Sequence, residues 1–176
     1  MESIKNGETM MTQKHPFAPI YNEDSEILIL GSFPSVRSRS DGFYYGHPQN
    51  RFWKLMAKLL NTDAPSMIEG KKAFLLNNHI ALWDVIASCE IENSSDSTIR
   101  NAVPNDLDEI FARADIRAVY TNGKTADKLY RKYHAREALC LPSTSPANAA
   151  FSMDRLEHAW KIIFEGKEEA YETNRT

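Results

Sequence analysis

The stretch Gly31-Ser32-Phe33-Pro34-Ser35-Val36-Arg37-Ser38 follows directly on a short apolar run, Ile27-Leu28-Ile29-Leu30. The apolar run has the length of a buried β-strand, and we predict a strand over about residues 26–31. A strand that ends in Gly-Ser and opens into a polar loop is typical of an open α/β sheet. Such a sheet builds its ligand site at the carboxyl ends of its strands. This stretch therefore predicts both the fold class and the place of the functional site.

Strand and helix patterns alternate along the rest of the chain. Apolar runs predict further strands at about 80–85, 116–121 and 138–141. Helical spacing of apolar residues predicts helices at about 49–60, 66–77, 105–113, 124–134 and 153–164, with Asn105 as the N-cap of the third. Repeated strand–helix alternation favours an α/β fold with a mostly parallel sheet and helices on both faces.

Composition sets limits on the class of protein. The 176 residues suit one domain over 15–166, with a polar, flexible segment at 1–14 and a charged tail at 167–176. The net charge of −3 excludes a uniformly basic nucleic-acid coat but leaves room for a local basic patch. No apolar run is long enough to span a bilayer, so the cytoplasm is the expected location. Two distant cysteines, Cys89 and Cys140, indicate small core residues rather than a disulfide framework or a metal site.

The loop after the first strand carries residue types that suit nucleic acid. Three consecutive aromatic residues, Phe43, Tyr44 and Tyr45, offer a face on which a base could stack, with two of them anchoring the loop as the plainer alternative. Arg37 lies among Ser35 and Ser38, a combination that suits phosphate contacts or simply a solvated loop.

Two further segments have both a structural and a functional interpretation. Asn50 comes just before a predicted helix, where its side chain could cap the helix or could hold a water or a base edge. The hydroxyl-rich segment 142–148 could bind a phosphodiester or could form an ordinary turn before the last helix. No zinc-ligand spacing or nucleophile motif is present, so we expect no metal or cofactor.

Taken in order, these segments resemble the uracil-DNA glycosylase superfamily, and in particular its hypoxanthine-DNA glycosylase branch. The likeness covers about residues 15–164 and is carried by 31–38, Tyr45-Gly46-His47-Pro48-Gln49-Asn50-Arg51-Phe52-Trp53, Ala81-Leu82-Trp83-Asp84-Val85, Asn122-Gly123 and Pro142-Ser143-Thr144-Ser145-Pro146-Ala147. The resemblance implies a three-layer α/β/α fold with a short, four-stranded central sheet. It also implies hydrolysis of the N-glycosidic bond of a deaminated base in double-stranded DNA, without metal or cofactor, by a monomer.

The resemblance implies a role for each part of the site. Asn50 is the implied catalytic residue, and it would orient the attacking water. The implied base pocket comprises Gly31, Ser32, Phe33, Pro34, Phe43, Tyr44, Tyr45 and Asn122. The implied DNA contacts are Ser35, Arg37, Ser38, Ser143, Thr144, Ser145, Pro146, Ala147 and Asn148. The last of these segments would enter the DNA where the base has left the stack.

The chain departs from the superfamily pattern at two positions. Phe33 stands where most members carry an Asp or Asn that positions water, and Ser143 and Thr144 stand where a His is usual. Two other functions therefore stay open, a non-catalytic protein that binds damaged DNA and a hydrolase of free nucleosides or nucleotides. Hypoxanthine and uracil both present a carbonyl beside a ring N–H, so the residues alone do not separate these two bases.

Overall fold

A parallel sheet forms the centre of the molecule. The computed structural model describes residues 2–5 and 8–165, and its central sheet has the strand order β4-β3-β7-β8 with every neighbouring pair parallel. The strands are β3 (Ile27–Gly31), β4 (Ile80–Asp84), β7 (Ala118–Asn122) and β8 (Leu139–Leu141). All residues of β3 and β4 are buried, as is typical of strands that are covered on both faces. The predicted fold class is confirmed.

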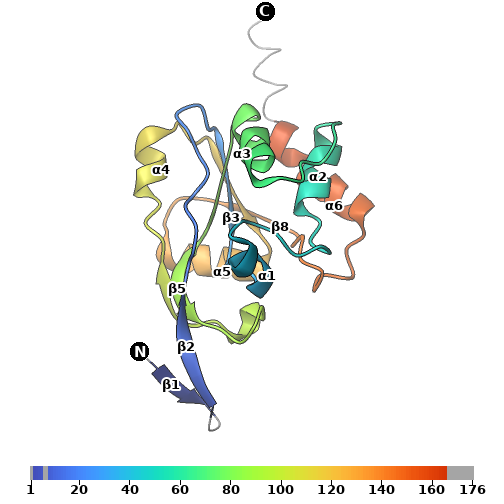
Figure 1. The fold of residues 1–176 in the computed structure, drawn as a ribbon. Coiled ribbons are helices and arrows are strands. Elements are labelled where there is room, and N and C mark those ends of the chain that lie inside the picture. The colour runs from blue at the N-terminus through green and yellow to red at the C-terminus, as the bar shows by residue number, and fades with distance from the viewer. Residues whose placement is uncertain (1, 6–7, 166–176) are drawn as a thin grey trace, which may run out of the picture.

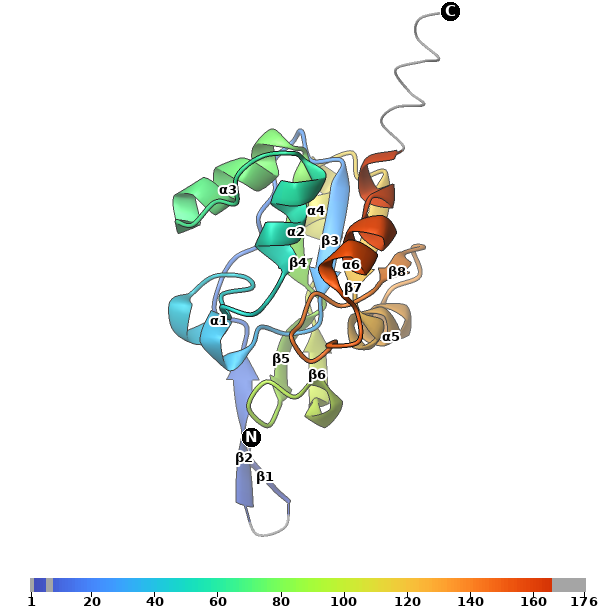
Figure 2. The same ribbon diagram turned by 90° about the vertical axis from the view of Figure 1, so that its right-hand side faces the viewer.

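Helices cover both faces of this sheet (Figures 1 and 2). On one side lie α2 (Phe52–Leu59), α3 (Ile68–Asn77) and α6 (Met153–Trp160), and on the other lie α4 (Asp108–Arg113) and α5 (Lys124–Tyr133). The spacing of apolar residues in α2 explains why this segment forms a helix. Phe52, Leu55 and Met56 share one face and are fully buried, while Lys54 and Lys58 face outward.

A second sheet, which the sequence analysis does not predict, extends from the end of β4. It is antiparallel, with the order β1-β2-β5-β6, and comprises β1 (Glu2–Lys5), β2 (Glu8–Lys14), β5 (Ile86–Glu90) and β6 (Arg100–Pro104). A short 3₁₀ helix, η1 (Asp96–Thr98), lies between β5 and β6. Strands β1 and β2 project from the body of the molecule (Figures 1 and 2).

The described part of the N-terminal segment consists of strands β1 and β2, and its expected flexibility stays a prediction. Strand β2 pairs with β5 through Thr12 and Glu90, Gln13 and Cys89, and Lys14 and Ser88. This ladder fixes the backbone that leads to His15, whose N–H donates to the carbonyl oxygen of Ala87 at 2.7 Å. The domain boundary at residue 15 stays a prediction, and the tail 167–176 lies outside the described residues.

Two local predictions are wrong. Asn105 does not cap a helix, because α4 begins at Asp108 and the buried Asn105 amide donates instead to the carbonyl oxygen of Asp84 at 2.9 Å. The loop after β3 contains a short helix, α1 (Val36–Asp41), which the sequence analysis treats as an irregular loop. Ser35 caps this helix, since its hydroxyl accepts the N–H of Ser38.

Candidate functional site

The carboxyl ends of the four parallel strands meet at one cavity. Gly31 of β3 pairs with Asp84 of β4, and Asn122 of β7 pairs with Leu141 of β8, so these strand ends lie side by side. All four residues line a cavity of about 980 Å³. A cavity of this size at this edge of an α/β sheet is where such folds bind their ligands.

Most of the residues that the sequence assigns to the site line this cavity. They are Gly31, Ser32, Phe33, Pro34, Ser35, Ser38, Tyr44, Tyr45, Asn50, Asn122 and the whole of 143–148. Two residues of the set lie elsewhere. Phe43 is buried against Trp53, with ring centroids 6.1 Å apart, and the exposed Arg37 pairs with Asp41 at 2.7 Å. Phe43 therefore anchors the loop and is not available for base stacking.

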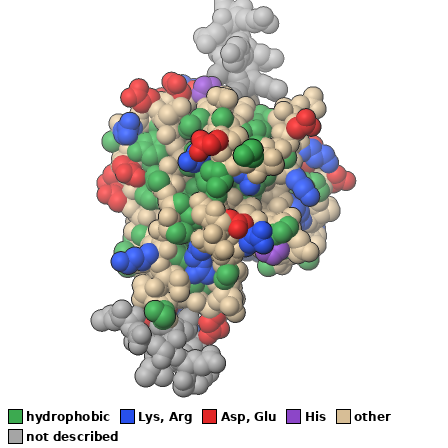
Figure 3. Space-filling view, viewed as in Figure 1, with side chains coloured by type: hydrophobic (Ala, Val, Ile, Leu, Met, Phe, Trp, Pro, Cys, Tyr) green, Lys and Arg blue, Asp and Glu red, His purple; other side chains and the backbone are tan. Residues whose placement is uncertain are grey.

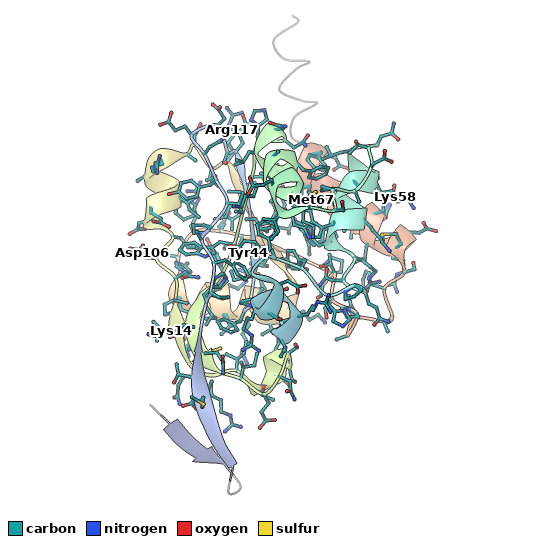
Figure 4. The ribbon with its side chains drawn as sticks, viewed as in Figure 1. Lys14, Tyr44, Lys58, Met67, Asp106 and Arg117 are labelled. Atoms are coloured by element: carbon teal, nitrogen blue, oxygen red, sulfur yellow. The ribbon has the colours of Figure 1, made fainter. Side chains whose placement is uncertain are left out.

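Tyr44 and Tyr45 have different positions in the site. Tyr44 lies near the centre of the molecule (Figure 4), and its hydroxyl donates to the carbonyl oxygen of Ala18 at 2.8 Å. Tyr45 has a left-handed backbone conformation, with φ of 54°, and its ring stacks on Phe52 with centroids 4.3 Å apart. This turn brings the Tyr45 hydroxyl, rather than its ring face, to the wall of the cavity.

A chain of hydrogen bonds links Asn50 to Tyr45 across the carboxyl edge of the sheet. The Asn122 amide nitrogen donates to Tyr45 Oη at 3.1 Å and to Thr144 Oγ1 at 3.0 Å. Thr144 Oγ1 donates in turn to Asn50 Oδ1 at 3.0 Å, and the Thr144 N–H donates to Asn122 Oδ1 at 3.0 Å. Side chains that are far apart in the sequence are thereby held in one fixed arrangement.

The donors and acceptors of this network determine which groups are left for a ligand. Asn50 Oδ1 already accepts from Thr144 Oγ1 and from the N–H of Phe52, so the amide nitrogen is the group that Asn50 can offer to the cavity. Its bond satisfies the N–H of Phe52, the first residue of α2, although the N-cap position itself is Arg51. The functional interpretation of Asn50 stays a prediction. The Tyr45 oxygen accepts from Asn122, which leaves its own hydrogen to be donated. Burial and the nearby Asp84 carboxylate raise the pKa of the Tyr45 hydroxyl, so this hydrogen is retained.

Asp84 brings a carboxylate to the same part of the cavity wall. A Cβ built on Gly31 would lie 2.3 Å from Asp84 Oδ1 and 3.2 Å from Tyr45 Oη, so both oxygens stand close above the Gly31 backbone. Within residues 2–5 and 8–165, Asp84 Oδ1 accepts no hydrogen bond, whereas Oδ2 bonds to His15 Nε2 at 2.7 Å. The cavity wall near Gly31 therefore presents a donor, the Tyr45 hydroxyl, and an acceptor, Asp84 Oδ1.

Replacement of Gly31 by alanine tests this close approach. The new methyl group would force Asp84 or Tyr45 to move, and we expect the free energy of unfolding to fall by about 1–3 kcal/mol. Urea unfolding measures the change. The matched control is Gly70→Ala in α3, where a Cβ meets only Pro65 at 3.7 Å and should stabilise the helix by about 0.5–1 kcal/mol. Equal stability changes in the two variants would contradict the packing described above.

A second acidic residue, Asp96, also lines the cavity. The Asp96 carboxylate accepts from the buried Ser32 hydroxyl at 2.8 Å. Burial raises the pKa of Asp96, the Ser32 hydrogen bond opposes this shift, and the charge of Asp84 adds to it. The Ser32 hydroxyl is therefore committed to Asp96 rather than free for a ligand.

Arg51 holds the loop that follows β8. Its guanidinium donates to the carbonyl oxygens of Ser145 and Asn148, each at 3.1 Å, and to that of Phe151. Its backbone N–H donates to the carbonyl oxygen of Thr144 at 3.1 Å. One residue, through its side chain and its backbone N–H, thus ties the segment 144–151 to the start of α2, directly beside Asn50.

The two departures from the family pattern have structural explanations. Phe33 is buried, and its ring edge meets His15 with centroids 6.1 Å apart, so it forms a wall rather than a water site. Thr144 is fully buried and supplies the hydroxyl that joins Asn122 to Asn50.

Ser38, which the resemblance assigns to the DNA contacts, is buried. Its hydroxyl accepts the N–H of Gly46, so it stabilises its own loop and does not reach a phosphate.

Four residues of the site, Asp84, His15, Asp96 and Arg51, are not predicted from the sequence. Asp84 carries a detectable signal, because it is a charged residue at the end of a wholly apolar strand. His15 lies 69 residues away from its partner, and no local pattern links the two. Arg51 follows Asn50 directly, but its partners are backbone carbonyl oxygens. Every residue has such an oxygen, so the residue types of the partners do not predict these bonds.

The described part of the chain contains no cluster of three or more His, Cys, Asp or Glu side chains that could hold a metal ion. None of the helices seen in residues 2–5 and 8–165 is both long and apolar enough to cross a bilayer. On the face shown in Figure 3, basic side chains are mixed with acidic ones rather than gathered into a single patch.

Comparisons with known proteins agree with this geometry. The model of the uracil DNA glycosylase superfamily matches residues 18–165. A protein of Methanosarcina acetivorans named hypoxanthine DNA glycosylase is 36% identical over 157 residues, which are 86% of this chain and 98% of that protein. A protein of the same name from Methanosarcina barkeri is 32% identical over 156 residues, with the same coverage. A solution NMR structure from M. acetivorans, described as a candidate uracil DNA glycosylase, superposes with a TM-score of 0.74 at 36% identity over 90% of this chain and 99% of its own.

Proposed function

Because the chain belongs to the uracil DNA glycosylase superfamily, we propose that it is a DNA repair glycosylase that excises a deaminated base, hypoxanthine in the first place. The observation that carries the proposal is the donor and acceptor pair in the cavity wall near Gly31, formed by Tyr45 Oη and Asp84 Oδ1. Deamination replaces an amino group beside a ring nitrogen lone pair with a carbonyl beside an N–H. The Tyr45 hydroxyl would donate to the carbonyl of a deaminated base, and Asp84 Oδ1 would accept from its N–H. The amino group and lone pair of the undamaged base would meet a donor and an acceptor in the wrong order.

The discrimination has a physical basis. A carboxylate can only accept a hydrogen bond, so Asp84 Oδ1 would face the N–H of hypoxanthine favourably and the lone pair of adenine unfavourably. A site that leaves buried polar groups unpaired with the wrong ligand rejects that ligand strongly. Uracil carries the same carbonyl and N–H pair and would also satisfy it. The names of the curated relatives favour hypoxanthine.

The proposed reaction begins with a base that has left the duplex stack, because the glycosidic bond is out of reach inside it. The bond from C1′ to the base nitrogen breaks, and its electron pair goes to the base. The Asn50 amide nitrogen donates to a water and holds it against C1′. The water oxygen bonds to C1′ and its proton passes to solvent, while the departed base takes up a proton from solvent. The Tyr45 hydroxyl donates to the base carbonyl, where negative charge develops.

The segment 143–148 and the loop at 35–37 are the proposed DNA contacts. The tip of the first segment, formed by the half-buried Pro146 and the exposed Ala147, would occupy the gap that the base leaves in the stack. Ser143 and Ser145 accept backbone N–H groups of their own loop, so each hydroxyl keeps its hydrogen for a phosphate oxygen. The guanidinium of Arg37 is exposed beside Asp41 and could reach a phosphate. We further propose that the protein acts as a monomer on double-stranded DNA in the cytoplasm.

Excision without added metal tests the proposal. The protein is incubated in EDTA with labelled duplexes that contain one inosine, one uracil or only normal bases, and abasic sites are then cleaved with alkali. Strand breakage at inosine is the expected result, whereas breakage only at uracil would keep the reaction and change the preferred base. Tight binding to the damaged duplex without breakage would instead support a protein that binds damage and leaves the base attached.

Replacement of Asp84 by asparagine should weaken base selection. A hydrogen bond to a charged group contributes about 1.5–3 kcal/mol, so we expect kcat/KM for inosine to fall about 10–100-fold. Single-turnover excision from inosine and adenine duplexes measures the effect. Asp41→Asn is the matched control, because Asp41 pairs with the exposed Arg37 and does not line the cavity. An unchanged rate for Asp84→Asn would remove Asp84 from base recognition.

A further inference from the structure

His15 follows strand β2 directly and packs behind three residues that line the cavity, Phe33, Tyr44 and Asp84. Its side chain is 4% exposed and packs against the rings of Phe17, Phe33 and Tyr44, with centroids 4.7, 6.1 and 6.0 Å away. Both ring nitrogens are bonded, Nδ1 to the carbonyl oxygen of Phe17 at 2.8 Å and Nε2 to Asp84 Oδ2 at 2.7 Å. A histidine that is held on every side in this way has one orientation.

The hydrogen bonds also fix the protons of this pair. A carbonyl oxygen can only accept, so His15 Nδ1 carries a hydrogen. A second hydrogen must lie between Nε2 and Asp84 Oδ2, because two lone pairs would otherwise face each other at 2.7 Å. The pair as a whole therefore has no net charge. With the hydrogen on Nε2, it is an imidazolium beside a carboxylate.

This neutrality matters in a site for DNA. An uncompensated carboxylate near the leaving base would oppose the negative charge that develops there and would repel the phosphates nearby. Asp96 already places a second acidic group in the same cavity. A positive partner for Asp84 lets its Oδ1 accept from a base N–H without that opposition. Oδ2 is occupied by His15, so Oδ1 alone faces the ligand.

We propose that His15 is a positioning residue that acts through Asp84, so that the N-terminal strand β2 is part of the base-reading site. This inference rests on the proposed function. The ladder between β2 and β5, together with the bond from the His15 N–H to Ala87, sets the place of the imidazole. The segment that precedes the family match at residue 18 therefore supplies a group that the catalytic domain needs.

The test compares two replacements of His15 in the full chain. His15→Phe keeps the ring packing and removes both hydrogens, and we expect kcat for inosine excision to fall about 10–100-fold with a smaller change in KM. His15→Gln keeps an N–H that can reach Asp84 and should restore part of kcat. The surface variant His79→Asn is the control, since His79 also bonds a backbone carbonyl, that of Asp24, but does not line the cavity.

A double-mutant cycle separates positioning from a general loss of structure. If His15 acts only through Asp84, the variant that carries both His15→Phe and Asp84→Asn should have the kcat of Asp84→Asn alone. This double variant leaves no buried unpaired carboxylate, so we expect it to fold even if His15→Phe does not. Its kcat, compared with that of Asp84→Asn, then still tests the inference. Additive losses, or a wild-type rate for His15→Phe, would overturn the inference while the proposed function stands. Failure of the wild-type protein to excise any base would overturn the proposed function itself.

Discussion

Replacement of Asn50 by alanine is expected to lower the single-turnover rate of base excision by about 10²–10³-fold, with little change in affinity for the damaged duplex. Asn50 is half-buried at the cavity wall, and its oxygen is held by Thr144 and by the N–H of Phe52. The amide nitrogen alone is left to orient a water. Alanine removes that donor but leaves the surface that meets DNA in place.

The measurement pairs excision rates with fluorescence anisotropy on the same inosine duplex. Thr144→Val is a useful companion, because it removes the hydroxyl that fixes the Asn50 amide and leaves the amide itself. We expect its rate to lie between those of the wild type and Asn50→Ala. If Asn50→Ala loses binding and excision to the same degree, the residue holds DNA rather than water.

Replacement of Arg51 by methionine is expected to lower excision from duplex DNA by about 100-fold while sparing excision from single-stranded DNA. Methionine keeps much of the aliphatic bulk and removes all the donors to Ser145, Asn148 and Phe151. The segment 144–151 then loses its fixed shape. A base in a duplex needs that segment to fill the gap it leaves, at a cost of a few kcal/mol, whereas a base in a single strand does not.

The ratio of the excision rate on duplex DNA to that on single-stranded DNA distinguishes two effects of the variant. A displacement of the neighbouring Asn50 would lower both rates, whereas a loss of the loop structure would lower only the rate on duplex DNA. Urea unfolding of the same variant should show a loss of about 2 kcal/mol, as expected for hydrogen bonds from a charged group. Arg155→Met is the matched control. Arg155 also donates to a backbone carbonyl, that of Ala150, but from the exposed face of α6. A similar loss on single-stranded and duplex DNA would show that Arg51 supports the chemistry and not the loop.

The sequence predicts the parallel sheet and the convergence of its strand ends because both follow from local patterns. Buried strands such as β3 and β4 are continuous apolar runs, and parallel strands bring their carboxyl ends to one edge. Asn122 at the end of β7 and Thr144 after β8 thus meet at this edge. Asn50 joins them from the start of a helix, a position that only the family resemblance implies. Their functional roles stay predictions.

Local sequence patterns do not predict the antiparallel sheet. Strand β5 follows β4 after Val85 alone, with no turn residue to mark a new element, and β6 is mostly exposed. Asn105 looks like a cap, but its amide is drawn into the core by the carbonyl oxygen of Asp84. The His15–Asp84 pair depends on strand pairing across 69 residues, which no local pattern encodes.

The stack of Tyr45 on Phe52 has a consequence for the size of the base. It joins the two ends of the loop between Tyr45 and Phe52. Under the proposed function, the hydroxyl that reads the base lies at one end of this loop and Asn50 lies near the other. If the proposed function holds, the loop length would set the span from the base edge to the glycosidic carbon, which is greater for a purine than for a pyrimidine. We expect natural variants with insertions or deletions at 46–49 to differ in the ring size of the base that they excise.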